Sequence, residues 1–117
     1  MPQIFTEGLH TAEFLLSEAE GSYSREQVTL AASAGALSSG QLLGKVTATG
    51  KYVPYADGAT DGSHVAAAIL YAPAPDLTVD QEVTVIVRAS EVASYALVGL
   101  DAPARADLAT AGIVVRD

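Results

Sequence analysis

The sequence predicts a mainly β domain with one short C-terminal helix and an extended N-terminal arm. Apolar runs of strand length recur between Gly, Pro and Asp turn residues over most of residues 25–117. A single segment near the C-terminus carries the start and stop signals of a helix. Residues 1–24 differ from the rest because they contain no Lys or Arg. At 117 residues, one domain accommodates the whole pattern.

Residues 1–24 hold four of the acidic residues and two small apolar clusters. Neither cluster has the length or periodicity that specifies a helix or a strand by itself. We therefore predict an arm that takes its structure from a partner, and a domain over residues 25–117. A terminal strand of the domain's own sheet is the alternative. The expected contacts are the apolar residues Ile4, Phe5, Phe14, Leu15 and Leu16.

The sequence pattern predicts short strands in the first half of the domain. Residues 27–30 form a strand candidate, and residues 42–48 alternate in a way that suits a half-buried strand. Thr49-Gly50 supplies a turn, and residues 51–53 return as the hairpin partner. Pro54 cannot donate to a ladder, so that strand ends there or lies on an edge.

The second half adds strands and the helix. Residues 66–71 form a continuous apolar run typical of a buried strand, and residues 82–88 alternate with valines on one face. Asp101 is a suitable N-cap, and Pro103 suits the first turn of a helix over residues 104–111. Gly112 fits the position after the helix, and residues 113–115 close the chain as a short strand.

Composition excludes several classes of function. The chain carries 14 acidic and 6 basic residues, a formal charge of −8, and its Lys and Arg are scattered singly. A protein that neutralises phosphates needs grouped bases, so we expect no direct nucleic-acid contact. There is no cysteine, which excludes disulfides and thiolate chemistry. The start lacks the basic residues of a secretory signal, and no apolar run could span a bilayer, so we expect synthesis in a cytoplasm and no membrane contact.

Two segments resemble chemical motifs. Residues 40–46 lack the spacing of a phosphate-binding loop and its Ser or Thr after Lys45. Residues 57–64 place Asp57 and Asp61 as in a calcium loop, but two oxygen ligands are missing. Asp61 and His64 could pair as acid and base, yet no nucleophile accompanies them. Asp and Gly serve turns more commonly, so we predict a turn, no catalytic residue, no metal and no cofactor.

Several blocks of the sequence, in this order, resemble the head decoration proteins of lambda-like tailed phages, and in part their prophage branch. The resemblance runs from about Ser17 to the end of the chain. The blocks are Ser24-Arg25-Glu26-Gln27-Val28-Thr29-Leu30, Gly44-Lys45-Val46-Thr47-Ala48-Thr49-Gly50-Lys51-Tyr52-Val53-Pro54-Tyr55, Asp57-Gly58-Ala59-Thr60-Asp61-Gly62-Ser63, Ala66-Ala67-Ala68-Ile69-Leu70 and Leu108-Ala109-Thr110-Ala111-Gly112-Ile113-Val114-Val115-Arg116.

The resemblance implies a β-clip-like bent ribbon that assembles as a homotrimer and has no enzymatic activity. It further implies binding to the major capsid protein on the outer surface of the expanded head, at three-fold sites, where the trimer stabilises the shell against DNA pressure. Residues 1–24 match the arm that pairs with capsid strands in this family. Two alternatives stay open: a β-rich module that recruits another protein, and a trimeric β-clip hydrolase using the loop at residues 57–64.

Overall fold

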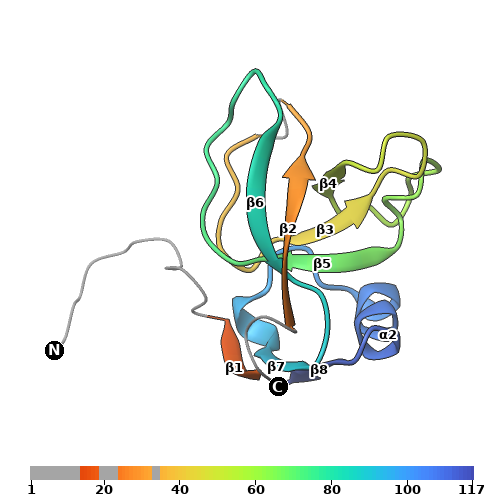
Figure 1. Ribbon diagram of the computed structural model, residues 1–117. Coiled ribbons are helices and arrows are strands. Elements are labelled where there is room, and N and C mark those ends of the chain that lie inside the picture. Colours follow the sequence, from red (N-terminus) through yellow and green to blue (C-terminus); the bar gives the residue numbers. More distant parts are fainter. Residues whose placement is uncertain (1–13, 19–23, 33–34) are drawn as a thin grey trace, which may run out of the picture.

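The computed structural model describes residues 14–18, 24–32 and 35–117, and it shows a mainly β fold with one short C-terminal helix (Figure 1). This part of the prediction is confirmed. The elements in chain order are β1 (Leu15–Glu18), β2 (Arg25–Leu30), β3 (Leu42–Lys45), β4 (Tyr52–Pro54), β5 (Ala66–Leu70), β6 (Gln81–Ile86), β7 (Ser90–Ala93), the 3₁₀ helix η1 (Ser94–Ala96), α2 (Ala102–Thr110) and β8 (Ile113–Arg116).

Five strands close a small barrel in the order β2-β4-β3-β5-β6. Its longest ladder is antiparallel and joins β2 to β6 from Arg25↔Ile86 to Leu30↔Gln81. Alternate side chains of these strands point inward, as the pleat of a strand requires. They fill the barrel interior with Val28, Leu30, Leu43, Tyr52, Ala68, Leu70 and Val85, and Ala74 from the loop after β5 joins this core.

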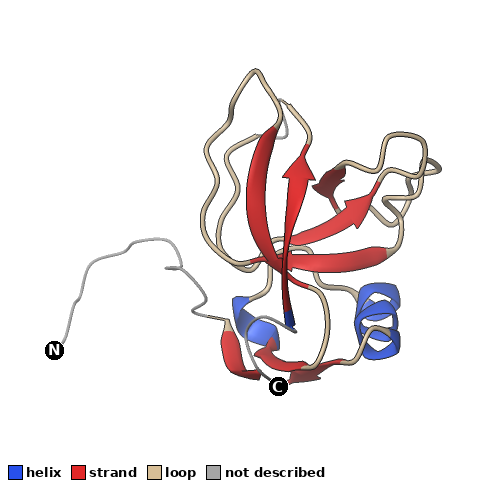
Figure 2. Cartoon of the chain, in the orientation of Figure 1, coloured by secondary structure: helices blue, strands red, loops and turns tan. Residues whose placement is uncertain are grey.

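A second, three-stranded sheet in the order β1-β7-β8 lies with α2 at the base of the barrel (Figure 2). β1 runs antiparallel to β7, whereas β7 and β8 are parallel. A second core lies between this sheet, the helix and the barrel. It contains Phe14, Leu42, Tyr55, Ala66, Ile69, Ile86, Val92, Ala93, Ala96, Ala104, Leu108 and Ile113.

The predicted strands are present, with shifted ends. The strand predicted over residues 42–48 ends at Lys45, because the amide of Val46 bonds the carbonyl of Lys51 and begins the turn to β4. Gly44 lies in β3 so close to a neighbouring loop that an added Cβ would stand 2.4 Å from the carbonyl oxygen of Ser63. Pro54 is the last residue of β4, as predicted.

The helix α2 is fixed by the signals that predict it. The carboxylate of Asp101 accepts a hydrogen bond from the amide of Ala104 at 2.8 Å, which is the N-cap interaction. Gly112 follows the helix with φ +88°, a conformation that glycine adopts without a steric cost. The strand β7 was not predicted from the sequence, since Ser90-Glu91-Val92-Ala93 lacks both length and a clear alternation.

Candidate functional site

The five predicted anchor residues have different positions. Ile4 and Phe5 lie outside the described residues. Phe14 is 0% exposed and belongs to the core at the base of the barrel, where its carbonyl accepts a bond from the amide of Ala93 at 2.9 Å. Leu15 is partly buried against the same core, and Leu16 is 52% exposed. Within the described residues, Leu16 is therefore the predicted anchor that faces outward.

The strand β1 stands at the edge of its sheet. Among the described strands it pairs with β7 alone, through Leu15↔Val92 and Glu18↔Ser90. The pairing shifts between Leu15 and Ser17, so Leu16 falls at an irregularity of the ladder. For residues 15–18 the structure thus shows the alternative, a terminal strand of the domain's own sheet. An edge strand offers main-chain groups to which a further strand can add.

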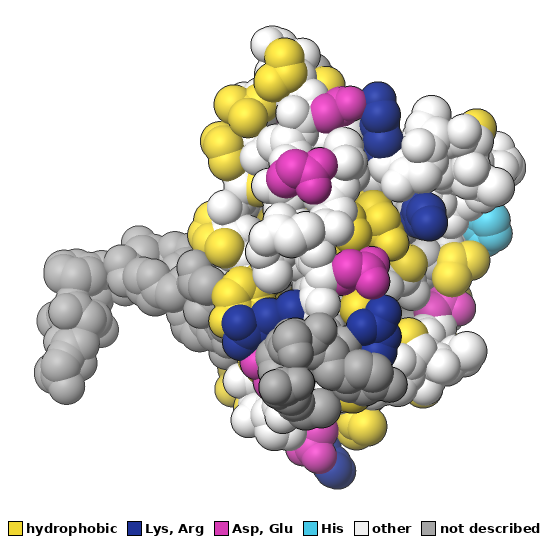
Figure 3. Space-filling view, viewed as in Figure 1, with side chains coloured by type: hydrophobic (Ala, Val, Ile, Leu, Met, Phe, Trp, Pro, Cys, Tyr) yellow, Lys and Arg dark blue, Asp and Glu magenta, His cyan; other side chains and the backbone are white. Residues whose placement is uncertain are grey.

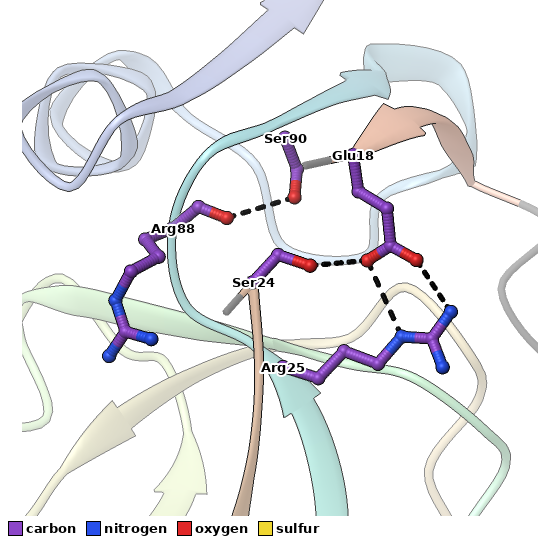
Figure 4. A network of polar contacts seen from close by, with 5 residues as sticks. All are labelled: Glu18, Ser24, Arg25, Arg88 and Ser90. Carbon is purple, nitrogen blue, oxygen red and sulfur yellow. Dashed lines mark hydrogen bonds and ion pairs between the residues drawn. The ribbon is translucent and has the colours of Figure 1, made fainter. Parts of the chain in front are cut away.

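A polar network ties β1 to the start of β2 (Figure 4). The guanidinium of Arg25 bonds the carboxylate of Glu18 at 2.5 Å, and the hydroxyl of Ser24 donates to the same carboxylate. Arg25 also lies over the ring of Tyr71, 4.4 Å from its centre, which is a cation–π contact. Through Glu18 and Tyr71 together, Arg25 joins the small sheet to the barrel.

The network controls the charge of Glu18. Burial raises the pKa of this carboxyl, but the hydrogen bonds from Arg25 and Ser24 and the positive charge of Arg25 outweigh burial. The pKa of Glu18 therefore lies below its ordinary value of 4.5. The hydrogen bond to Glu18 raises the pKa of Arg25 in turn. Both groups are charged at neutral pH, and the link between β1 and β2 is a charge-assisted one.

An open hollow of about 240 Å³ lies beside this network, between the ends of β1, β7 and β8. Its lining includes Ser17, Glu91 and Val114, which lie on adjacent strands in the sheet. Ala89 also lines it and adopts a left-handed conformation with φ +53°. The hydroxyl of Ser90 donates to the carbonyl of Arg88 at 3.0 Å and closes this bend (Figure 4). The base of the domain, formed by β1, β7 and β8, thus presents an edge strand, the exposed Leu16 and an open recess.

The loop at residues 57–64 is built as a turn. The carboxylate of Asp61 accepts bonds from the amide and the hydroxyl of Ser63, at 3.0 and 2.6 Å. These bonds lower the pKa of Asp61 and supply the side-chain to backbone contact that is typical of an aspartate turn. His64 is exposed. In residues 14–18, 24–32 and 35–117, no group of three or more His, Cys, Asp or Glu side chains could hold a metal ion.

The segment at residues 40–46 leads into β3 rather than into a helix. A phosphate-binding loop opens a helix whose amide groups face the phosphates, so the strand geometry contradicts that motif. None of the helices in the described part of the chain is long and apolar enough to cross a membrane.

An exposed strand edge beside an open recess can accept a strand from another protein. The model of the family "Bacteriophage lambda head decoration protein D" matches residues 4–113, and the chain belongs to this family. No curated protein matches the chain.

Membership of the family confirms the resemblance and assigns the chain a role in decorating a phage capsid. The family is structural rather than enzymatic, and its place is the capsid surface of the virion. Sequence reasoning missed the part of the base formed by β7, because its four residues carry no periodic signal. It also missed the Glu18–Arg25 pair, whose residues are seven positions apart and meet only through the fold.

Proposed function

We propose that this chain is a cementing protein that binds the outer surface of the expanded head of a tailed double-stranded DNA phage. It binds as a homotrimer at three-fold sites, contacts the major capsid protein, and stabilises the shell against the pressure of packaged DNA. The observation that carries the proposal is the place of β1, an edge strand that lies within the predicted arm of residues 1–24.

The geometry at β1 favours attachment by strand addition. A capsid segment, or the arm lying on a capsid strand, gains main-chain hydrogen bonds, and alternate side chains enter pockets. Leu16 stands 52% exposed at this edge, and Ile4 and Phe5 of the arm are the further proposed anchors. The Glu18–Arg25 pair holds the root of the arm on the rigid barrel, so the attachment transmits force to the whole domain.

Trimer formation explains how weak arms hold a shell together. Once one arm of a trimer has bound, binding of the other two arms is intramolecular. The combined affinity therefore exceeds that of any single arm by orders of magnitude. Because the three arms reach different capsid subunits, separation of those subunits would have to break the contacts of the trimer as well. The net charge of −8 suits an outer coat that does not bind the packaged DNA.

Two other functions compete with this proposal. A β-rich module that recruits a different protein would use the same arm and the same edge strand. A trimeric β-clip hydrolase would need the loop at residues 57–64, but there Asp61 bonds Ser63 within a turn. Membership of the decoration family favours capsid attachment over both.

The test measures binding of the purified chain to expanded, undecorated heads and to unexpanded procapsids of the cognate phage. We expect density at the three-fold sites of expanded heads only. Deletion of residues 1–13 keeps Phe14 and β1 in place, so the domain should stay folded and lose most of its affinity for heads. Leu16→Asp should weaken binding by at least about tenfold, which corresponds to 1.4 kcal/mol.

Val65→Asp is the matched control, because Val65 is 45% exposed and lies outside the base. It should bind heads as the wild type does. Failure of the wild-type chain to bind expanded heads would contradict the proposal. Binding by the deletion variant with unchanged affinity would contradict the role of the arm.

A further inference from the structure

Two Asp-Gly pairs lie in the loop that joins β4 to β5, at Asp57-Gly58 and Asp61-Gly62. They are the only Asp-Gly pairs in the chain, and the chain contains no asparagine. An aspartate that precedes glycine is prone to isomerise, because glycine has no side chain to shield its backbone amide nitrogen. The two sites share this local chemistry, so their surroundings in the fold decide which of them reacts.

Isomerisation of aspartate is a reaction of the chain with itself and consumes no cofactor. The amide nitrogen of the glycine attacks Cγ of the protonated carboxyl, a C–N bond forms, and the amide hydrogen and the carboxyl hydroxyl leave as water. Water then opens the resulting succinimide ring. Addition at Cγ restores aspartate, whereas addition at the α-carbonyl carbon gives isoaspartate, in which the chain continues through Cγ. Ring closure requires that the nitrogen and Cγ can approach one another.

Asp57 and Gly58 are exposed and lightly held. They are the central residues of a turn that the amide of Ala59 closes on the carbonyl of Ala56 at 3.0 Å. Within the described residues, the carboxylate of Asp57 makes no hydrogen bond and no ion pair. A Cβ added to Gly58 would meet nothing within 4 Å, so the space around the reacting groups is open. Figure 3 shows this part of the molecule, at the upper right, projecting from the body.

Asp61 and Gly62 are held on both sides. The carboxylate of Asp61 accepts bonds from the amide and the hydroxyl of Ser63, at 3.0 and 2.6 Å, and Ser63 is buried. The carbonyl of Asp61 accepts a bond from the amide of Thr47 at 2.9 Å. A Cβ added to Gly62 would stand 2.6 Å from the carbonyl oxygen of Lys45, so the backbone is packed closely here. Ring closure at this site must break these bonds and displace the neighbouring turn.

The protonation state of Asp61 acts in the same direction as its geometry. The hydrogen bonds from Ser63 lower the pKa of the Asp61 carboxyl. Because only the protonated carboxyl loses water in ring closure, a lowered pKa leaves less of the reactive form. Two identical dipeptides in one loop therefore differ in access, in packing and in hydrogen bonding, and each difference favours reaction at Asp57.

We propose that Asp57 is a modification site of this protein, at which aspartate converts spontaneously to isoaspartate in the folded chain while Asp61 is protected. The product carries a free α-carboxylate, the group that isoaspartyl methyltransferases esterify with S-adenosylmethionine. Proteins of a finished virion are not replaced, so the modified form accumulates as the particle ages. The turn at residues 56–59 lies outside the base, and the inference therefore does not depend on the proposed mode of capsid attachment.

The test incubates the full folded chain at neutral pH and physiological temperature and follows isoaspartate at each site. Electron-transfer fragmentation of the tryptic peptide of residues 52–88 distinguishes isoaspartate at the two positions. Asp57 should convert at least about tenfold faster than Asp61. In guanidinium chloride, where the fold is lost, the two sites should convert at similar rates. Transfer of labelled methyl groups from S-adenosylmethionine by an isoaspartyl methyltransferase measures the total independently.

Two variants test the physical cause. Gly58→Ala places a methyl group in open space beside the attacking nitrogen, so it should keep the fold and slow conversion at Asp57 at least about tenfold. Ser63→Ala removes one of the two bonds to the carboxylate of Asp61, so it should speed conversion there and leave Asp57 unchanged. Circular dichroism checks that each variant is folded.

Three results would overturn the inference. The first is equal conversion at Asp57 and Asp61 in the folded chain, and the second is faster conversion at Asp61. The third is a folded chain that converts at neither site under conditions in which the unfolded chain converts at both. An unchanged rate at Asp61 in the Ser63→Ala variant would contradict protection by that hydrogen bond.

Discussion

Phe14 and Leu16 show at the scale of single residues how position decides the role of a side chain. The two residues are apolar and two positions apart in the chain. Phe14 nevertheless fills the core between the small sheet and the barrel, whereas Leu16 lies at an irregular point of the edge strand and faces outward. The predicted capsid contact at Phe14 stays a prediction, and its visible contribution is to hold β1 against the domain.

This difference predicts unequal effects on stability. Phe14→Ala should lower the free energy of unfolding by about 3–5 kcal/mol, because a fully buried aromatic side chain leaves a cavity. Leu16→Ala should change it by less than about 0.5 kcal/mol, as expected for an exposed site. Urea unfolding of the two variants measures both values. Equal, small effects would show that Phe14 does not belong to the core.

Ionisation of Glu18 should make the stability of the fold depend on pH. Its pKa is lowered in the folded chain, mainly because the bonds from Arg25 and Ser24 outweigh its burial. Because this pKa is lowered, ionised Glu18 stabilises the fold at pH values above its ordinary pKa of 4.5. The stabilisation is lost as the pH falls through the pKa of Glu18 in the folded chain. Wild type should therefore exceed Glu18→Gln in free energy of unfolding at pH 7, and the difference should shrink as the pH falls below 4.5. A difference independent of pH would contradict the ion pair.

The helix α2 shows how one element is fixed by several weak interactions. Its N-cap residue Asp101 also accepts a bond from the buried hydroxyl of Tyr55 at 2.9 Å. Burial and the bond to Asp101 raise the pKa of Tyr55 far above its ordinary value. Asp107 in the same helix accepts a bond from the amide of Ala66 at 3.0 Å, which ties α2 to β5. The helix is thus attached to the barrel at both of these aspartates.

Because Asp101 both caps α2 and accepts the bond from Tyr55, its substitution should lower the free energy of unfolding more than the loss of a simple N-cap does. Asp101→Ala should lower the free energy of unfolding by about 2 kcal/mol or more, because it removes the cap and leaves the Tyr55 hydroxyl without its partner. Asp101→Asn keeps an oxygen acceptor at the same place and should cost under about 1 kcal/mol. Thermal unfolding compares the two variants. Equal losses in both would indicate that the charge, rather than the acceptor, matters.

The whole molecule combines two cores that are built mainly from Ala, Val, Leu and Ile. Aromatic residues make up only 6% of the chain, so burial per residue is modest, and association adds stability to such a domain. The base with β1 is the surface proposed for the capsid.

The proposed homotrimer predicts that stability depends on protein concentration. The melting temperature of the wild type should rise with protein concentration, because association favours the folded state by mass action. Scanning calorimetry over a hundredfold range of concentration measures this dependence. A wild-type melting temperature that stays constant would contradict assembly during folding.

The sequence by itself determined the class of fold, most of the strands and the helix, because these depend on local periodicity and capping. Asp101, Gly112 and the apolar run at residues 66–71 each predicted their element from neighbours in the chain. The family also followed from the sequence, since its ordered blocks need no geometry.

Only the tertiary structure decided the closed barrel, the strand β7, the burial of Phe14 and the Glu18–Arg25 pair. Each of these depends on contacts between segments whose pairing is set by packing rather than by local pattern. The loops at residues 35–41, 71–79 and 94–100 are also far apart in sequence, and backbone hydrogen bonds bring them together only in the fold.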